Sequence, residues 1–101
     1  MTRVVYEPAL PAIEFDGHAG AGVRGQDPVC AALSMLMLTL ERRMLDQAEQ
    51  MLPTISRGPG RFLIRCRPGD SWERSCRESF ETIFAGLTLL AEERPDCVQI
   101  Q

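Results

Sequence analysis

The two residues best suited to chemistry lie in one segment, 17–34: His18, the chain's only histidine, and Cys30. Gly17 precedes the histidine, and Gly20 and Gly25 lie between the two. A cysteine thiolate is a nucleophile, and a histidine within reach can take the thiol's proton and return it to a leaving amine. The spacing predicts a strand that ends at the histidine, a glycine-rich loop, and a helix that begins just before the cysteine.

Asp27 and Pro28 predict where that helix begins, because aspartate is a preferred N-cap residue and proline is favoured at the first helical position. Cys30 then falls in the first turn, where free backbone N–H groups and the helix dipole favour an anion. An accessible Cys30 should therefore be the most acidic thiol of the chain, and its own N–H is a candidate donor to an oxyanion. The Asp27 carboxylate opposes a second negative charge nearby, and a capping role or a hydrogen bond to His18 would reduce this conflict. Ser34 lies one helical turn after Cys30, on the same face.

Structural roles for the same residues stay open at this point. A cysteine near a helix start also serves as a small apolar packing residue, and a histidine after a strand is often structural. Glycine loops before helices also bind phosphate groups. This loop lacks the Gly-Lys-Ser/Thr ending of a P-loop and the Gly-x-Gly-x-x-Gly spacing of a dinucleotide site.

The whole pattern resembles the signature of the ribosomal-processing cysteine proteases, the Prp family. The matching positions are Gly17-His18-Ala19-Gly20, Gly25, Asp27, Val29-Cys30-Ala31-Ala32 and Ser34. The family implies a small cytoplasmic endopeptidase, usually a homodimer, without metal or cofactor. Its substrate is the N-terminal extension of a large-subunit ribosomal protein, the one numbered twenty-seven. Length and element order extend the resemblance over essentially the whole chain.

The resemblance also implies roles for single residues. The expected roles are general base for His18, nucleophile for Cys30, support for Asp27 and Ser34, and a flexible loop closing over the substrate for Gly17, Gly20 and Gly25. The sequence departs from the family at three positions: Ala21 replaces a typical aromatic residue, Pro28 an aliphatic one, and Asp16 a small residue or serine. Ala21 removes bulk from the loop that would touch the substrate, so the departures bear on substrate identity more than on catalysis.

Length and composition limit the number of domains and the classes of partner. The chain has 101 residues, a net charge of -3 and a pI near 5.1, which predicts a single domain over residues 1–101 and argues against nucleic-acid binding. The longest apolar stretch is too short to span a bilayer, and the N-terminal residues lack a signal-peptide pattern. We therefore expect a cytoplasmic protein with no membrane partner.

The other cysteines are expected to be reduced packing residues. Cys66, Cys76 and Cys97 form no Cys-x-x-Cys pair, so a zinc site is not indicated. A disulfide framework is equally unexpected in a chain without an export signal. Arg61, Arg65 and Arg67 are interpreted as a solvated strand face rather than a surface for an acidic partner.

Apolar periodicity predicts the order β-β-α-β-β-α-β. The expected strands are 2–6, 13–16, 54–56, 61–67 and 97–100, and the expected helices are 27–50 and, capped by Asp70 or Ser71, about 70–93. This order predicts an α+β domain of two layers, in which a mixed β-sheet packs against two α-helices. Gly86 lies inside the second helix, where glycine costs about 1 kcal/mol relative to alanine, so we expect a close helix–helix approach there.

These observations favour a cysteine endopeptidase with a His18–Cys30 dyad. Two other functions were weighed. One is a phage-type relative that processes a capsid or scaffold protein. The other is a non-catalytic, dimeric binding module that retains the two residues for stability.

Overall fold

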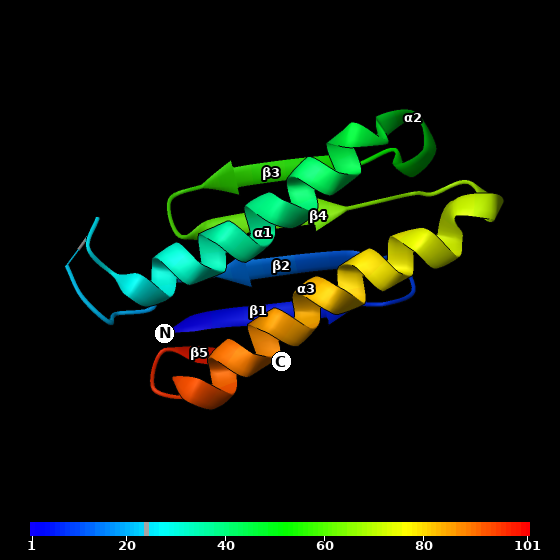
Figure 1. Ribbon diagram of the computed structural model, residues 1–101. Helices are drawn as coiled ribbons and strands as arrows, with labels where there is room; N and C mark the ends of the chain where they lie inside the picture. Colours follow the sequence, from blue (N-terminus) through cyan, green and yellow to red (C-terminus); the bar gives the residue numbers. More distant parts are fainter. Residues whose placement is uncertain (24) are drawn as a thin grey trace.

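Five strands form one mixed sheet in the order β3–β4–β2–β1–β5 (Figure 1). The structure, a computed structural model, describes residues 1–23 and 25–101. The strands are β1 (Thr2–Glu7), β2 (Ala12–Asp16), β3 (Thr54–Gly58), β4 (Arg61–Arg65) and β5 (Val98–Ile100). β1 pairs parallel with β5, and the other three neighbouring pairs are antiparallel. The expected mixed sheet is confirmed.

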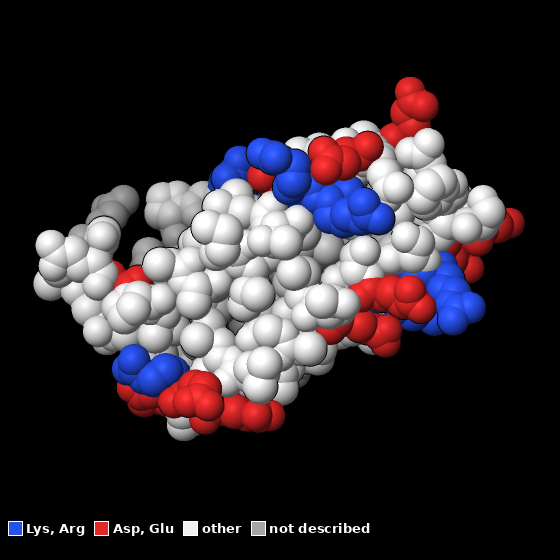
Figure 2. All heavy atoms as spheres, viewed as in Figure 1, with Lys and Arg blue, Asp and Glu red and all other residues white. Residues whose placement is uncertain are grey.

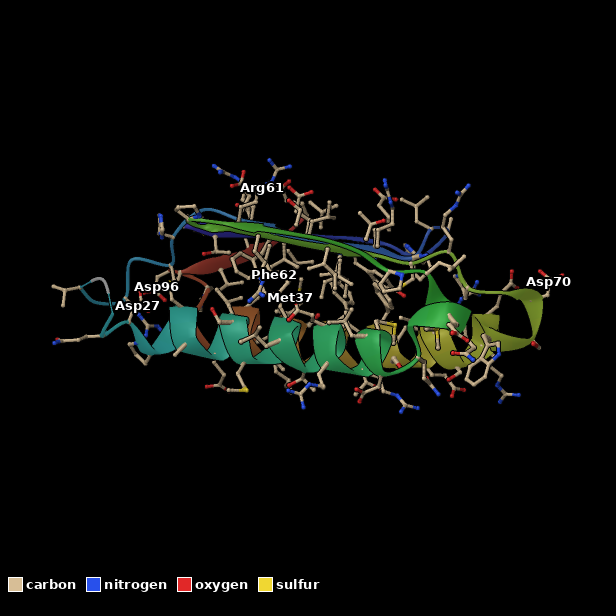
Figure 3. All side chains as sticks on the ribbon, turned by 90° about the horizontal axis from the view of Figure 1, so that it is seen from above. Asp27, Met37, Arg61, Phe62, Asp70 and Asp96 are labelled. Atoms are coloured by element: carbon tan, nitrogen blue, oxygen red, sulfur yellow. The ribbon has the colours of Figure 1, made fainter. Side chains whose placement is uncertain are left out.

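Two long helices cover one face of this sheet. They are α1 (Pro28–Asp46) and α3 (Glu73–Glu93); the short helices α2 (Ala48–Met51) and η1 (Asp70–Trp72) precede β3 and α3. Figure 3 views the molecule along the sheet and shows the helices on one side only. The two-layer α+β architecture and the element order are therefore confirmed, because alternating strands present one apolar face for amphipathic helices to cover.

The first helix ends earlier than predicted. The segment expected to continue to about residue 50 breaks at Gln47, whose φ of -127° and ψ of 43° are not helical. A separate turn, α2, follows, and Leu52 ends it with a positive φ of 46°. The apolar periodicity continues through Met51, which is fully buried, so the pattern alone could not reveal the break.

The predicted cap of the second helix is wrong. Neither Asp70 nor Ser71 caps α3: both lie inside η1, whose N–H to carbonyl bond runs from Trp72 to Gly69 at 2.8 Å. Trp72 occupies the N-cap position of α3, and no side chain caps that helix. A turn of 3-10 helix has replaced the capping box.

The core lies between the two layers. Fully buried side chains from the sheet, such as Ile13 and Ile64, meet fully buried side chains from the helices, such as Met37 and Phe80; Figure 3 shows Met37 pointing from α1 toward the sheet. Cys66, Cys76 and Cys97 are buried and free, which confirms their role in packing. Within residues 1–23 and 25–101, no helix combines the length and the apolar character that a bilayer crossing requires.

Gly86 marks a close contact between the two long helices, as predicted. A Cβ atom at this position of α3 would lie 2.7 Å from Cδ2 of Leu36 on α1. Such a separation is shorter than the van der Waals contact distance. The absence of a side chain at Gly86 therefore lets Leu36 fill the space between the helices. This contact holds α1, and with it the segment that carries Cys30, against α3.

We predict that Gly86→Val lowers the free energy of unfolding by about 2 kcal/mol, because the added methyl groups overpack the space that Leu36 occupies. Urea denaturation measures the change. The matched control is Ala85→Val, at the exposed neighbouring position, which should cost only the helix-propensity difference of about 0.5 kcal/mol. Equal losses for both variants would show that the helices do not make a close contact at Gly86.

Candidate active site

The backbone in front of His18 is held at two points. β2 ends at Asp16, and the next residue, Gly17, donates its N–H to the carbonyl oxygen of Gly60 at 2.7 Å. The hydroxyl of Thr2 donates to the carbonyl oxygen of Gly17 at 3.2 Å. Gly17 has a φ of +99°, a conformation that glycine adopts without strain. These bonds fix the point from which the exposed His18 side chain projects.

The His18 ring packs against a glycine of the β3–β4 turn. A Cβ at Gly60 would lie 2.8 Å from Nε2 and 3.0 Å from Cε1 of His18, and Gly60 itself has a φ of +66°. The space next to the imidazole therefore exists because residue 60 has no side chain. Nothing local in the sequence shows which residue this glycine approaches.

Asp27 caps α1, as predicted, and also ties the glycine loop to the helix. Its Oδ1 accepts the N–H groups of Val29 at 2.9 Å and Cys30 at 3.0 Å, and its Oδ2 accepts the N–H of Ala21 at 3.0 Å. The Cys30 N–H is the largest cause that lowers the pKa of this carboxyl below its ordinary value; burial acts in the opposite direction. Figure 3 shows Asp27 at the start of α1.

This cap corrects the expectation that the Cys30 N–H stabilises an oxyanion. That N–H is donated to Asp27 Oδ1, and the N–H of Ala31 is donated to the Asp27 carbonyl oxygen at 3.1 Å. The donors that a first turn usually leaves free are occupied here. An oxyanion formed near Cys30 needs donors from another segment.

Cys30 is the one half-exposed cysteine; the other three are buried. It lies on the face of α1 that also carries Ser34, and both side chains border a recess of about 250 Å³ between α1 and the β3–β4 hairpin. His18 and Gly17 border the same recess. The floor is apolar, formed by Phe15, Leu33, Leu38 and Phe62.

A second hollow, of about 320 Å³, lies on the side of the glycine loop. Its walls are Gly20, Gly22, Gly25, Asp27 and Pro59, and His18 and Cys30 border it as well. The imidazole and the thiol therefore lie where the two hollows meet. All seven residues singled out from the sequence come together here, four on the recess and three on the second hollow in addition to the shared pair.

Arg57 and Phe62 also border the recess, and their roles were not evident from the sequence. Arg57 on β3 lies opposite Phe62 on β4, and its guanidinium carbon is 5.4 Å from the centre of the Phe62 ring. Its Nε is 3.4 Å from Oε1 of Glu41 on α1. Only the pairing register of the hairpin brings these residues together, and a short apolar run does not specify register.

The site offers a thiol, an imidazole and an apolar recess. Among the residues that the structure describes, no cluster of three or more histidine, cysteine or carboxylate side chains could hold a metal ion. A half-exposed thiol and an exposed imidazole that border the same two hollows are suited to nucleophilic attack on a carbonyl group, in which the imidazole moves the proton. A side chain of the molecule under attack would enter the recess.

The comparisons with known proteins agree with this chemistry. The family model "Cysteine protease Prp" matches residues 1–99. The essential ribosomal processing protease Prp of S. aureus, solved in complex with a covalently linked product peptide, superimposes with a TM-score of 0.80 at 21% identity, over 99% of this chain and 95% of that one. The same protease with a substrate peptide gives a TM-score of 0.76 at 21% identity, over 100% and 98% of the two chains.

A protein from Streptococcus mutans superimposes with a TM-score of 0.69 at 25% identity, over 99% of this chain and 90% of that one. A search of curated protein sequences gives no match. The family model covers nearly the whole chain, and the solved structures show the same fold. This chain therefore belongs to the Prp family of cysteine proteases and is a cysteine-type endopeptidase.

Proposed function

We propose that Cys30 is the nucleophile and His18 the general base of this endopeptidase, and that it removes the N-terminal extension of the large-subunit ribosomal protein numbered twenty-seven. The observation that carries the proposal is that both side chains border both hollows. The family assignment supports the cysteine chemistry. The particular ribosomal protein is proposed from the resemblance to the Prp family, and the similar S. aureus protein is a ribosomal processing protease.

The proposed reaction begins when His18 takes the proton of the Cys30 thiol. The sulfur attacks the peptide carbonyl carbon, and the carbonyl oxygen becomes an oxyanion. As this tetrahedral state collapses, the C–N bond breaks, and His18 gives its proton to the leaving amine. A thioester remains on Cys30. Water then attacks it, with His18 as base, to release the carboxylate product and the free thiol.

The glycine loop is placed to supply donors for the oxyanion. Because the N–H groups of Val29 and Cys30 are bound by Asp27, the first turn of α1 does not offer them. The backbone of the loop borders the hollow next to Cys30 at Gly20, Gly22 and Gly25. Backbone N–H groups that point at a developing negative charge stabilise the transition state without later rearrangement.

We also propose that the protein acts as a homodimer in the cytoplasm. Figure 2 shows a broad uncharged area over α1 and α3, with charged side chains gathered at its margins. Met35 on α1 is 65% exposed and Leu89 on α3 is 60% exposed. Large exposed apolar patches are unusual on monomeric proteins, and a second copy of the same face would cover this one.

Cys30→Ala should abolish cleavage of a synthetic peptide that carries the extension of the host's ribosomal protein twenty-seven, because the variant has no nucleophile. Iodoacetamide at neutral pH should add once to the native wild-type protein and not to Cys30→Ala over the same time, as shown by intact-protein mass spectrometry. Cys97→Ala, which removes a buried thiol, is the matched control and should keep both properties.

The outcomes separate the proposals. Undiminished cleavage by Cys30→Ala would refute the assigned nucleophile. Rapid alkylation of Cys30 without cleavage of this peptide would refute the ribosomal substrate and direct the search to another protein, such as a capsid or scaffold protein. An unreactive Cys30 without cleavage would favour a binding module.

The Asp27 carboxylate that caps α1 should make the stability of the protein depend on pH in the acidic range. Because the pKa of Asp27 is lowered in the folded protein, its contribution is complete above the ordinary value of about 3.8 and is lost as pH falls through the lower folded value. Thermal melts should show that wild type loses more stability than Asp27→Asn between about pH 4 and pH 2. At pH 7 Asp27→Ala, which has no cap, should melt roughly 5 °C below wild type. Equal acid sensitivity of wild type and Asp27→Asn would contradict this role.

Met35→Glu should shift the protein from dimer to monomer, because it places a charge at an exposed apolar position of α1. Sedimentation velocity distinguishes the two states. The matched control is Leu52→Glu, which changes another exposed apolar residue, 56% exposed, outside the two long helices. A monomeric wild-type protein, or a dimer that tolerates Met35→Glu, would rule out this interface.

A further inference from the structure

The recess beside Cys30 has an apolar floor and a cationic border. The charged residues that border it are Arg57 and Arg61. In the part of the chain that the structure describes, no carboxylate borders this recess. Each arginine pairs with a glutamate that does not border the recess, Arg57 with Glu41 and Arg61 with Glu14.

The two arginines are not equivalent. Figure 3 shows Arg61 pointing away from the helix layer, whereas Phe62 points toward it. The Arg61 Nε lies 3.3 Å from Oε1 of Glu14, which is on the same outer face of the sheet. Arg61 therefore places its charge on the far side of the sheet. Arg57 pairs with Phe62 across the hairpin and shares its face, so its charge lies on the side of the recess.

Two neighbours fix the Arg57 guanidinium. It lies over the Phe62 ring, with 5.4 Å from Cζ to the ring centre, and its Nε is 3.4 Å from the Glu41 carboxylate. The Glu41 side chain is only 14% exposed, while that of Arg57 is 56% exposed. The Arg57–Glu41 ion pair connects the edge strand β3 with α1. Because an arginine has five N–H donors, the contact through Nε leaves the two terminal amino groups available to a ligand.

One face of α1 carries both the residues that border the recess and the glutamate that pairs with Arg57. Cys30, Ser34, Leu38 and Glu41 follow one another at intervals of four, four and three residues, which places them on one face of α1. The thiol is at one end of this line and the partner of Arg57 at the other. A peptide whose apolar side chain fills the recess next to Cys30 therefore brings its neighbouring side chains toward Arg57.

We propose, on the basis of the proposed peptidase function, that Arg57 is a specificity-determining residue that selects peptides with a carboxylate beside a large apolar side chain. The apolar side chain packs on the floor formed by Phe15 and Phe62, and the carboxylate pairs with the guanidinium. A lysine in the same place meets the guanidinium, and the nearby Glu41 carboxylate is already paired with Arg57. Glu41 orients the guanidinium and takes no part in the contact with the peptide.

Binding is measured in the Cys30→Ala background by fluorescence anisotropy, so that cleavage is not required. The probes are fluorescein-labelled Gly-Ala-Asp-Phe-Asp-Ala-Gly, its Asn-Phe-Asn analogue and its Lys-Phe-Lys analogue. We expect the Asp peptide to bind about five-fold more tightly than the Asn peptide, and the Lys peptide to bind most weakly. The preference should decrease as NaCl rises from 0.05 M toward roughly 1 M.

Three further variants test whether the preference for the Asp peptide comes from Arg57. Arg57→Gln should remove the preference, so that the Asp and Asn peptides bind equally. Arg61→Gln, on the same hairpin but with its charge on the other face, should keep the preference. Glu41→Gln, which removes the charge that orients the guanidinium, should weaken the preference without abolishing it. Loss of the preference in all three variants would show a general structural effect and overturn the proposal, as would equal binding of the three peptides or no binding of any.

The two proposals can fail separately. The same peptides are incubated with the protein that retains Cys30. Selective binding without cleavage of any peptide would count against the peptidase function and leave the charge selection standing. Cleavage with equal efficiency of the Asp, Asn and Lys peptides would establish the peptidase and overturn the selection by Arg57.

Discussion

One carboxylate, that of Asp27, connects the two segments from which the candidate active site is built. One oxygen accepts the N–H groups of Val29 and Cys30, and the other accepts the N–H of Ala21. The first two bonds define where α1 begins. The third ties the glycine loop to that point. If the carboxylate were absent, the helix could still form through its packing, but the loop and the thiol would lose their common anchor.

This anchor affects the chemistry in two opposite ways. A negative charge next to Cys30 disfavours a thiolate, and the cap occupies the N–H groups that would otherwise favour it. The hydrogen bonds lower the pKa of Asp27, so the carboxylate remains charged throughout the neutral range. In the proposed mechanism, activation of the thiol therefore depends on proton transfer to His18 rather than on the helix terminus. The position of the imidazole becomes the critical variable of the site.

The imidazole is positioned by contacts distant in sequence. Gly17 donates to the Gly60 carbonyl oxygen at 2.7 Å, and the ring of His18 fills the space that Gly60 leaves free. The turn between β3 and β4 thus acts as the support of the histidine. The same hairpin carries Arg57 on the recess. The proposed base and the proposed specificity residue therefore depend on one hairpin, and the proposed nucleophile depends on the helix opposite to it.

A feature could be predicted from the sequence when the residues that create it are close together along the chain or follow helical periodicity. The cap by Asp27, the strand before His18 and the contact at Gly86 are properties of neighbouring residues or of helical periodicity, and the structure confirms them. The contact of Gly60 with His18 joins residues 42 positions apart, a separation at which no local pattern gives a signal.

The failures have the same origin. The residues expected to cap α3 form a turn of 3-10 helix instead, because a Ser or Asp near a helix start can stabilise more than one local conformation. The Arg57–Phe62 contact needs the hairpin register, and a shift of one residue would place Arg57 on the outer face. The residues proposed to carry out the chemistry are thus recognisable from their types and spacing. The residue proposed to select the peptide is recognisable only when the sheet and the helix are placed together.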